Sequence, residues 1–189
     1  MNIPRLLLLT DRSQLPAGRG LIDAVRACAG AGLTHVVVRE HDVPPPRRER
    51  LVTALAAVDG LTVLSSRLPA EAAAGLHLSA DQAQPPSGWF GRSCHDLGEV
   101  RRAAAEGAAY ATLSPFAATA SKPDYGPPVA RVDYAGHHGV PVLALGGIDP
   151  GNAADARAAG AHGVAVMGCV MRAADPALVV RALLREVGA

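Results

Sequence analysis

The sequence predicts a compact TIM (β/α)8 barrel, and three observations favour this α/β fold. Eight short apolar segments recur at roughly even intervals along the 189 residues, each followed by a helical pattern or a loop. No two of these segments are joined by the Asn-Gly or Asp-Gly turn of a β-hairpin, so parallel strands are expected. The length suits one domain, and residues 1–189 are predicted to form a single barrel domain. A doubly wound open sheet is the alternative, but no Gly-x-Gly-x-x-Gly motif follows the first strand.

The predicted strands are short apolar runs. They span residues 5–10, 34–39, 61–64, 76–78, 89–93, 110–113, 140–145 and 162–167. The run at 140–145 is almost continuously apolar, as expected for a parallel strand that is buried on both faces. Since 49% of the residues are hydrophobic but only 3% are aromatic, Ala, Val and Leu must fill the core.

Helical spacing of apolar residues or a capping residue predicts the connecting helices. They are expected at residues 21–29, 47–58, 69–74, 96–106, 129–138, 150–159 and 176–187, with a further helical stretch after residue 168. Asp149 is predicted to cap the helix that starts at Pro150, and the run RRER at 47–50 is interpreted as solvated helix surface. The residues expected to face inward in the last helix are Leu178, Val179, Ala182, Leu183 and Val187.

Composition and charge exclude several classes of protein. A formal net charge of +1 gives no reason to expect nucleic acid or an anionic membrane surface as a partner. The three cysteines are too scattered for a metal motif, and their odd number argues against a disulfide framework, so a cytoplasmic location is expected. No apolar run approaches the length of a membrane span. The oligomeric state is left open, with a homo-oligomer among the alternatives.

Glycine turns follow the last two predicted strands. Gly146-Gly147 and Gly168 each stand directly after an apolar run, where a backbone without side chains can approach a ligand closely. Two such turns on neighbouring parallel strands predict a phosphate site built from backbone N–H groups. The alternative is that these glycines only make tight connections between strand and helix.

A long polar loop follows the sixth predicted strand. It carries Thr119, Ser121 and Lys122, and its position places it beside the glycine turns. A cation and hydroxyl groups next to N–H donors suit a phosphate monoester. The alternative is a lysine that lies on the surface with no ligand.

Other polar residues gather at the carboxyl ends of the predicted strands, where the active site of a barrel lies. Their acids are few: Asp81 is the only acid at the ends of the third and fourth strands, and the histidines lack metal-ligand spacing, so no metal site is predicted. Glu40 has two interpretations, a reactive acid or an ion pair with its neighbour Arg39. His77 and His95 likewise suit either proton transfer or a structural hydrogen bond.

Seven segments of this chain resemble the thiamine phosphate synthase / TenI family, in the right order and spacing. They are LLLLTDR at 6–12, VVVRE at 36–40, LHLSADQ at 76–82, GRSCHDLGEV at 91–100, SPFAATASK at 114–122, VPVLALGGIDP at 140–150 and AGAHGVAVMG at 159–168. The resemblance covers nearly the whole chain. It implies a compact TIM barrel, a thiazole phosphate as the small-molecule partner, and phosphate-binding roles for the two glycine turns and the threonine-and-lysine loop.

The chain departs from the synthases of this family where the resemblance would place Mg²⁺ and the pyrimidine pyrophosphate. Val37 stands in place of Gln, His41 in place of Lys, Ser65-Ser66 in place of Asn-Asp and Asp81-Gln82 in place of Glu-Asp. Loss of these acids and of the lysine removes electrostatic support for a pyrophosphate leaving group. The resemblance therefore favours the TenI branch and a thiazole tautomerase, an isomerase that transfers a proton without metal or other cofactor.

The candidate site residues follow from the strand ends and the resemblance together. The catalytic candidates are His77, His95 and Glu40, and the substrate-binding candidates are Arg39, Ser66, Thr119, Ser121, Lys122, Gly146, Gly147, Met167 and Gly168. The histidine of the TenI pattern is replaced by Pro115, so another residue must act as the base. Two alternatives remain: a thiamine phosphate synthase that holds Mg²⁺ with Asp81 and Asp11, and a non-catalytic or regulatory protein that binds a phosphate ligand.

Overall fold

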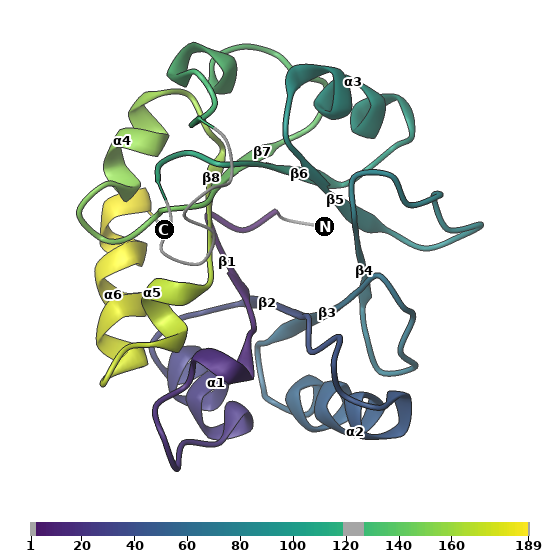
Figure 1. The fold of residues 1–189 in the computed structure, drawn as a ribbon, viewed down its shortest axis with the longest axis vertical. Helices are drawn as coiled ribbons and strands as arrows, with labels where there is room; N and C mark the ends of the chain where they lie inside the picture. Colours follow the sequence, from purple (N-terminus) through teal and green to yellow (C-terminus); the bar gives the residue numbers. More distant parts are fainter. Residues whose placement is uncertain (1–2, 119–126, 189) are drawn as a thin grey trace.

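Eight parallel strands close into a barrel in the computed structural model, which describes residues 3–118 and 127–188 (Figure 1). The strands are β1 (Leu6–Leu9), β2 (His35–Val38), β3 (Thr62–Ser66), β4 (Gly75–Leu78), β5 (Phe90–Cys94), β6 (Tyr110–Leu113), β7 (Val142–Leu145) and β8 (Gly163–Val166). Each strand pairs with its neighbours in sequence, and β8 pairs with β1. The predicted barrel is confirmed, and every predicted strand overlaps an observed one.

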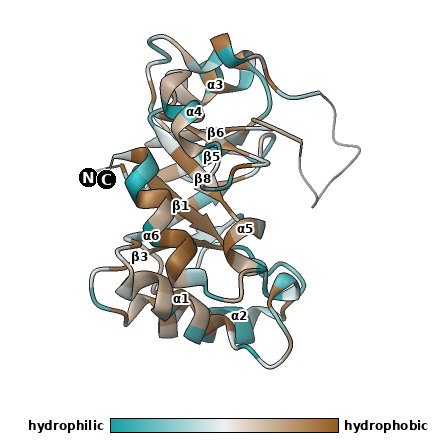
Figure 2. Ribbon diagram, turned by 90° about the vertical axis from the view of Figure 1, so that its left-hand side faces the viewer, coloured by the Kyte–Doolittle hydropathy of each residue, from teal (hydrophilic) through white to brown (hydrophobic). Residues whose placement is uncertain are grey.

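Helices surround the barrel on its outside (Figure 1). They are α1 (Leu21–Gly30), α2 (Pro45–Ala56), α3 (Leu97–Ala105), α4 (Ala153–Ala158), α5 (Gly168–Met171) and α6 (Pro176–Val187), with 3-10 turns at Arg12–Gln14 and Arg131–Tyr134. Irregular segments connect β3 to β4 and β4 to β5. Figure 2 shows hydrophobic residues concentrated in the strands, with many of the hydrophilic residues in loops and outer helices. None of the helices in the described part of the chain is both long enough and apolar enough to cross a membrane.

The alternation of side chains along each strand divides the core into two clusters. In β1, Leu7 and Leu9 belong to a cluster with Leu64, Tyr110 and other residues from the barrel strands, which fills the interior. Leu6 and Leu8 belong to the larger cluster between strands and helices. Burial of the strands on both faces explains why their sequences are continuously apolar.

Three predicted helices differ from the structure. Residues 69–74 form turns because the chain returns from β3 to β4 over a short distance. Only Arg131–Tyr134 of the predicted helix at 129–138 is helical, and Gly136 follows with a φ of 117° that is incompatible with a right-handed helix. The helix after β7 begins at Ala153 with Asn152 at the N-cap position, because the Asp149 carboxylate accepts a hydrogen bond from the N–H of Gly151 in a turn.

Two predictions of side-chain exposure were also wrong. In α6, Leu178 is 55% exposed, whereas Val180, Leu183 and Val187 form the buried stripe together with Pro176. In α2, Arg48 of the RRER run is not solvated but only 5% exposed. Its guanidinium group reaches the carboxyl ends of two strands, which makes it part of the framework of the site.

Candidate functional site

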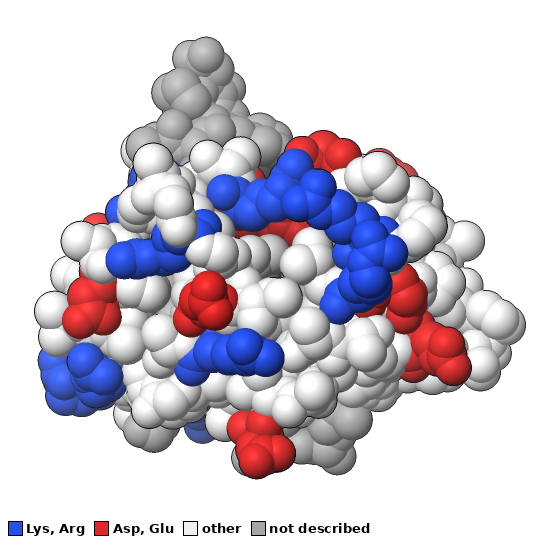
Figure 3. Space-filling view, turned by 90° about the horizontal axis from the view of Figure 1, so that it is seen from below, with Lys and Arg blue, Asp and Glu red and all other residues white. Residues whose placement is uncertain are grey.

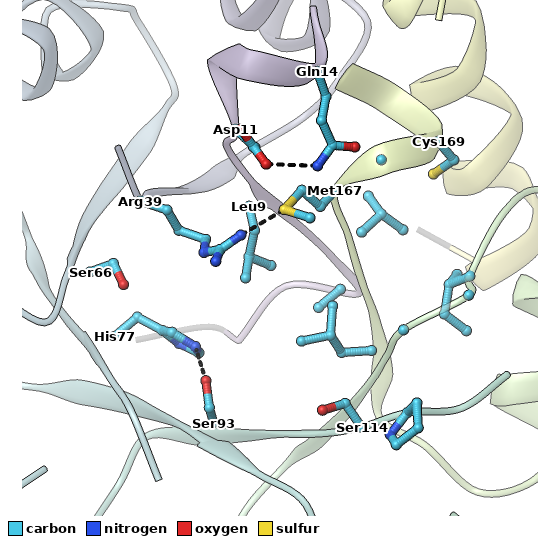
Figure 4. A pocket seen from close by; sticks show the side chains of 18 of the residues that line it. Leu9, Asp11, Gln14, Arg39, Ser66, His77, Ser93, Ser114, Met167 and Cys169 are labelled. Atoms are coloured by element: carbon cyan, nitrogen blue, oxygen red, sulfur yellow. Dashed lines mark hydrogen bonds between the residues drawn. The ribbon is translucent and has the colours of Figure 1, made fainter. Parts of the chain in front are cut away.

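A cavity of about 540 Å³ lies at the carboxyl ends of the strands, and residues at the ends of all eight strands line it (Figure 4). This is the position at which barrels of parallel strands place their sites. Among the residues that the structure describes, the lining holds two acids and three arginines. The charged residues of the lining are Asp11, Arg39, Arg67, Asp149 and Arg172.

The side of the cavity at β7 and β8 is formed by the predicted glycine turns. Gly146 and Gly147 have φ values of 93° and 66°, a region that side chains disfavour. A Cβ atom at Gly147 would collide with the carbonyl oxygens of Ala117 and Ala118, so the close approach of the two segments also requires glycine. Met167 and Gly168 line the same side after β8. The predicted glycine residues are therefore brought together, with backbone facing the cavity.

The side of the cavity at β2 and β3 carries side-chain cations. Arg39 extends across the cavity, and its Nη1 lies 2.7 Å from the Sδ atom of Met167 (Figure 4). Its backbone N–H donates to the Thr10 hydroxyl at 3.1 Å. Arg67 follows β3 and lines the cavity beside Ser66 and His41.

Arg67 has a backbone conformation that is unusual for its residue type. Its φ is 64°, and it is the one residue other than glycine with a positive φ in the part of the chain that the structure describes. Its N–H donates to the carbonyl of His77 at 2.9 Å, and its own carbonyl accepts from the Gln82 amide at 2.6 Å. A non-glycine residue in this region costs about 1–2 kcal/mol, so the bonds on both sides keep Arg67 in a strained position.

The buried Arg48 holds the ends of β2 and β3 in place. Its Nη2 donates to the carbonyl of Val38 at 3.0 Å and to that of Ser66 at 2.7 Å, and its Nη1 lies 3.4 Å from the carbonyl of Leu68. Val38 and Ser66 are the last residues of their strands, and the Ser66 carbonyl also accepts from the N–H of Leu68 at 2.8 Å. The hydrogen bonds of Arg48 also bring a positive charge beneath this side of the cavity.

His77 lies at the floor of the cavity and is fully enclosed. Its Nδ1 lies 2.9 Å from the Tyr110 hydroxyl, and its Nε2 lies 2.9 Å from the Ser93 hydroxyl. Burial, and then the charge of Arg39, lower the pKa of His77 to about 3, so the ring is neutral near pH 7. It is therefore suited to orienting hydrogen bonds rather than to supplying a proton.

The other two histidines of the cavity lining, His95 and His41, lie at its rim. His95 is exposed, and its Nδ1 lies 3.1 Å from the Ser114 hydroxyl. The Nε2 of His41 lies 3.4 Å from the Ser66 hydroxyl. Burial and the charges of Arg67, Arg39 and Arg48 lower the pKa of His41 to about 4, so it too is neutral near pH 7.

Glu40, the third catalytic candidate, is not among the residues that line the cavity. Its buried carboxylate accepts from the backbone N–H of Arg12 at 3.2 Å and lies 3.3 Å from the Arg12 Nη1. Glu40 does form an ion pair, but its partner is Arg12 and not the predicted Arg39. The pair with Arg12 ties the loop after β1 to the end of β2 and leaves Arg39 directed into the cavity.

The donor groups do not fit the Mg²⁺ ion that the family resemblance implies. Among residues 3–118 and 127–188, no three His, Cys, Asp or Glu side chains come together as a metal site. The Asp81 side chain is 94% exposed, lies outside the lining and is 3.9 Å from Arg102. Burial alone would raise the pKa of Asp11, but hydrogen bonds from Ser13 and Gln14 and the charge of Arg39 lower it overall, and the hydrogen bonds occupy the carboxylate. Asp81 and Asp11 therefore do not form the predicted metal-binding pair.

The remaining predicted residues lie outside the described part of the chain. These are Thr119, Ser121 and Lys122. Of the others, Arg39, Ser66, His77, His95, Gly146, Gly147, Met167 and Gly168 line one cavity. Sequence reasoning placed Arg67 among the polar residues at the strand ends but did not include it among the candidate site residues. Nothing in the helical pattern around Arg48 predicted its burial.

The fold and the cavity are those of a TIM-barrel protein with a small-molecule site at its strand ends. Comparison with known proteins narrows this class. The family model described as thiamine monophosphate synthase matches residues 67–170. The thiamine-phosphate synthase of Methanoculleus marisnigri is 33% identical over 97% of this chain and 95% of its own length. The bifunctional protein ThiM/ThiE of Symbiobacterium thermophilum is 36% identical over 87% of this chain, which matches 38% of that longer protein.

The chain belongs to the thiamine monophosphate synthase family, and the expectation that it is an enzyme is supported. The solved structure of the thiamine phosphate pyrophosphorylase from Pyrococcus furiosus has the same fold, with a TM-score of 0.83, 22% identity, and coverage of 97% of this chain and 95% of that one. The interpretation as a thiazole tautomerase is wrong. Relatives across most of the chain are named synthases, and nothing in the comparisons favours the TenI branch. The tautomerase interpretation rested on the replaced acids and lysine alone, and those replacements do not decide the reaction.

Proposed function

We propose that the chain is a thiamine-phosphate synthase, a transferase that couples a thiazole phosphate to a pyrimidine bearing a pyrophosphate. The observation that carries this proposal is the cavity with two sides suited to anions, glycine turns at β7 and β8 and arginines at β2 and β3. A reaction between two anionic substrates requires two groups of anion-binding residues in one cavity. Relatives named thiamine-phosphate synthase, 32–34% identical over at least 93% of this chain, support the same conclusion.

We assign the thiazole phosphate to the glycine side. Gly146, Gly147, Met167 and Gly168 line this side and would present backbone N–H groups to the phosphate. Lys122, with Thr119 and Ser121, is proposed to complete this side with a charge-assisted contact. The pyrimidine pyrophosphate would then lie toward Arg39 and Ser66.

The coupling forms a bond from the thiazole ring to the carbon that carries the pyrophosphate. The bond from this carbon to oxygen breaks, and its electron pair leaves with the pyrophosphate. The main requirement is stabilisation of the negative charge that develops on the leaving group. The neutral His77, fixed by Tyr110 and Ser93, would serve as a rigid polar floor rather than as an acid. We propose that His95, at the rim, contacts the substrate.

The test is to incubate the protein with thiazole phosphate, pyrimidine pyrophosphate and Mg²⁺, and to follow thiamine phosphate and pyrophosphate by chromatography. We expect both products in equal amounts. Arg39→Gln should lower the rate strongly, whereas Arg50→Gln on the exposed face of α2 should leave it unchanged. Binding of thiazole phosphate with no product from the wild-type protein would contradict the proposal and favour a non-catalytic binding protein.

A further inference from the structure

Arg172 brings a guanidinium group to the glycine side of the cavity. It follows α5 directly, and it lines the cavity together with Gly168, the first residue of that helix. A Cβ atom at Gly168 would lie 2.6 Å from the Arg172 Nη2 atom and 2.7 Å from its Cζ atom, so the guanidinium group rests against the Gly168 backbone. A cation therefore covers the turn after β8.

Gly168 needs to be glycine for a different reason from Gly146 and Gly147. Those two residues have positive φ values, whereas Gly168 begins α5 without one. An alanine could adopt the backbone conformation of Gly168, but its Cβ atom would enter the space that the guanidinium group occupies. The missing side chain at Gly168 therefore gives room to Arg172, and the two residues act as one unit.

Gln14 holds the Arg172 side chain in this position. Its Oε1 atom accepts a hydrogen bond from the Arg172 Nη1 atom, and its Nε2 atom donates to the Asp11 carboxylate at 2.7 Å (Figure 4). Because Gln14 is neutral, its bond orients the guanidinium group without neutralising the charge. The loop after β1 thus orders a long side chain before a ligand arrives, which lowers the entropic cost of binding.

The charge of Arg172 acts on the same segment of backbone. Burial is the main cause that raises the pKa of the neighbouring Cys169 thiol to about 11. The charge of Asp149 adds to this rise, and the charge of Arg172 opposes it. Asp149 would repel a phosphate at this turn, and Arg172 offsets that repulsion.

Exposure of an arginine does not by itself mark a site in this protein. Arg172 is exposed, and Figure 3 shows that Lys and Arg side chains also gather in an arc on the face seen from below. Arg172 differs from a solvated arginine because it lines the cavity, lies against a glycine that leaves room for it, and is hydrogen-bonded to Gln14, another lining residue. These contacts aim its charge at the glycine side.

We propose that Arg172 is a specificity-determining residue, which selects the thiazole phosphate over the same thiazole with a free hydroxyl group. This inference rests on the proposed function and adds a side chain to the backbone N–H groups of the glycine side. A guanidinium group donates two parallel hydrogen bonds to phosphate oxygens, which gives both charge and orientation. A free hydroxyl carries no charge and cannot accept such a pair. Gln14 is a positioning residue, since it acts through Arg172.

The test is isothermal titration calorimetry of the full chain with thiazole phosphate and, separately, with the unphosphorylated thiazole alcohol. Arg172→Gln should weaken thiazole phosphate binding about 10- to 100-fold, because it removes a charge-assisted contact. Its affinity for the alcohol should equal that of the wild type. The matched control is Arg181→Gln, an exposed arginine of α6 outside the cavity lining, which should bind both compounds as the wild type does.

Gly168→Ala tests the contact between the two residues. This variant keeps the backbone N–H and suits a helix, but its Cβ atom would displace the guanidinium group. We expect it to weaken thiazole phosphate binding as Arg172→Gln does, and we expect the double variant to be no weaker than Arg172→Gln alone. Additive losses would show that the Cβ atom obstructs the phosphate by itself, which would overturn the inference.

Two other results would also overturn it. One is equal thiazole phosphate affinity in the Arg172→Gln and Arg181→Gln variants, and the other is a parallel loss of both thiazole compounds in Arg172→Gln. The synthase assay gives a separate answer. A wild-type protein that makes thiamine phosphate, with unchanged thiazole phosphate affinity in Arg172→Gln, retains the proposed function and refutes the role of Arg172. A wild-type protein that binds no thiazole phosphate refutes both.

Discussion

The two sides of the cavity that we propose to bind anions are built by different means. At β7 and β8, Gly146 and Gly147 bring the backbone itself to the cavity, in conformations that side chains disfavour. At β2 and β3, Arg39 and Arg67 extend long charged side chains from backbone that the buried Arg48 holds in place. The first side is a property of local chain conformation, whereas the second depends on contacts between segments that are distant in sequence.

The two sides therefore differ in the substitutions that they can tolerate. A backbone site fails when any side chain enters its glycine positions, because the space is already filled by Ala117 and Ala118. A side-chain site can exchange one means of neutralising charge for another.

The largest expected effect is at Arg48. Arg48→Met leaves the Val38 carbonyl without the Arg48 donor and the Ser66 carbonyl with only the Leu68 N–H, and it removes a buried, hydrogen-bonded guanidinium group, which should lower the free energy of unfolding by about 3 kcal/mol. The measurement is urea denaturation followed by circular dichroism. Arg50→Met on the same helix provides the control and should change stability by about 0.5 kcal/mol or less. A similar loss in both variants would remove Arg48 from the framework of the site.

The next effect is at the glycine side. Gly147→Ala combines a positive φ with a collision against two carbonyl oxygens, and we expect it to lower the free energy of unfolding by about 2–3 kcal/mol and to abolish thiazole phosphate binding. Gly107→Ala is the matched control, since Gly107 has a φ of 77° but open space around its Cβ position. It should cost only about 1 kcal/mol, from the backbone conformation alone. Equal effects of the two substitutions would contradict the close approach at Gly147.

A third prediction concerns the floor between the two sides. The pKa of His77 is about 3 in the folded chain against an ordinary value of 6.5, so below pH 6.5 the unfolded chain binds a proton that the folded chain does not. The contribution of the neutral His77 to the free energy of unfolding is therefore fully present above pH 6.5, and it is lost as the pH falls toward 3. Between pH 7.5 and pH 5 the loss should be about 2 kcal/mol.

Denaturation of the wild-type protein and of His77→Gln at both pH values measures this contribution. The variant should lose less stability than the wild type on acidification, by about the same 2 kcal/mol. Parallel losses in the two proteins would mean that His77 is protonated in the folded state, and the neutral floor would be wrong.

The smallest expected effect is a gain in stability rather than a loss. Arg67→Gly should raise the free energy of unfolding by about 1 kcal/mol, because glycine adopts a φ of 64° without strain. Pyrophosphate affinity should fall in the same variant. A gain in stability with a loss of binding would show that the strain is kept for the ligand, whereas a loss of stability would show that the Arg67 side chain supports the fold.

The sequence predicted the parts of the molecule that depend on neighbouring residues. Strand positions could be read from apolar runs because strands buried on both faces require them, and the closed barrel followed from their number and spacing. The glycine side was predicted because its residues directly follow two strands. The helix start at Ala153 was misplaced because Asp149 forms a turn within three residues, a choice that capping preference alone does not decide.

The arginine side was predicted only in part. Arg39 and Ser66 were assigned from their strand ends, but Arg67 was not included among the candidate site residues, because its backbone strain is a property of the fold. Arg48 was interpreted as solvated because it belongs to a charged run on a helix, and its burial depends on where α2 packs against two strand ends. The partner of Glu40 was likewise decided by the loop after β1, which brings Arg12 to it.

The most direct test of a cavity with two separate anion sides is calorimetric titration of pyrophosphate into the wild-type protein, with and without saturating thiazole phosphate. We expect both anions to bind together, with a coupling that changes the pyrophosphate affinity by no more than about fivefold. If thiazole phosphate instead displaces pyrophosphate in simple competition, the two anions share one site and the division between the glycine side and the arginine side is wrong.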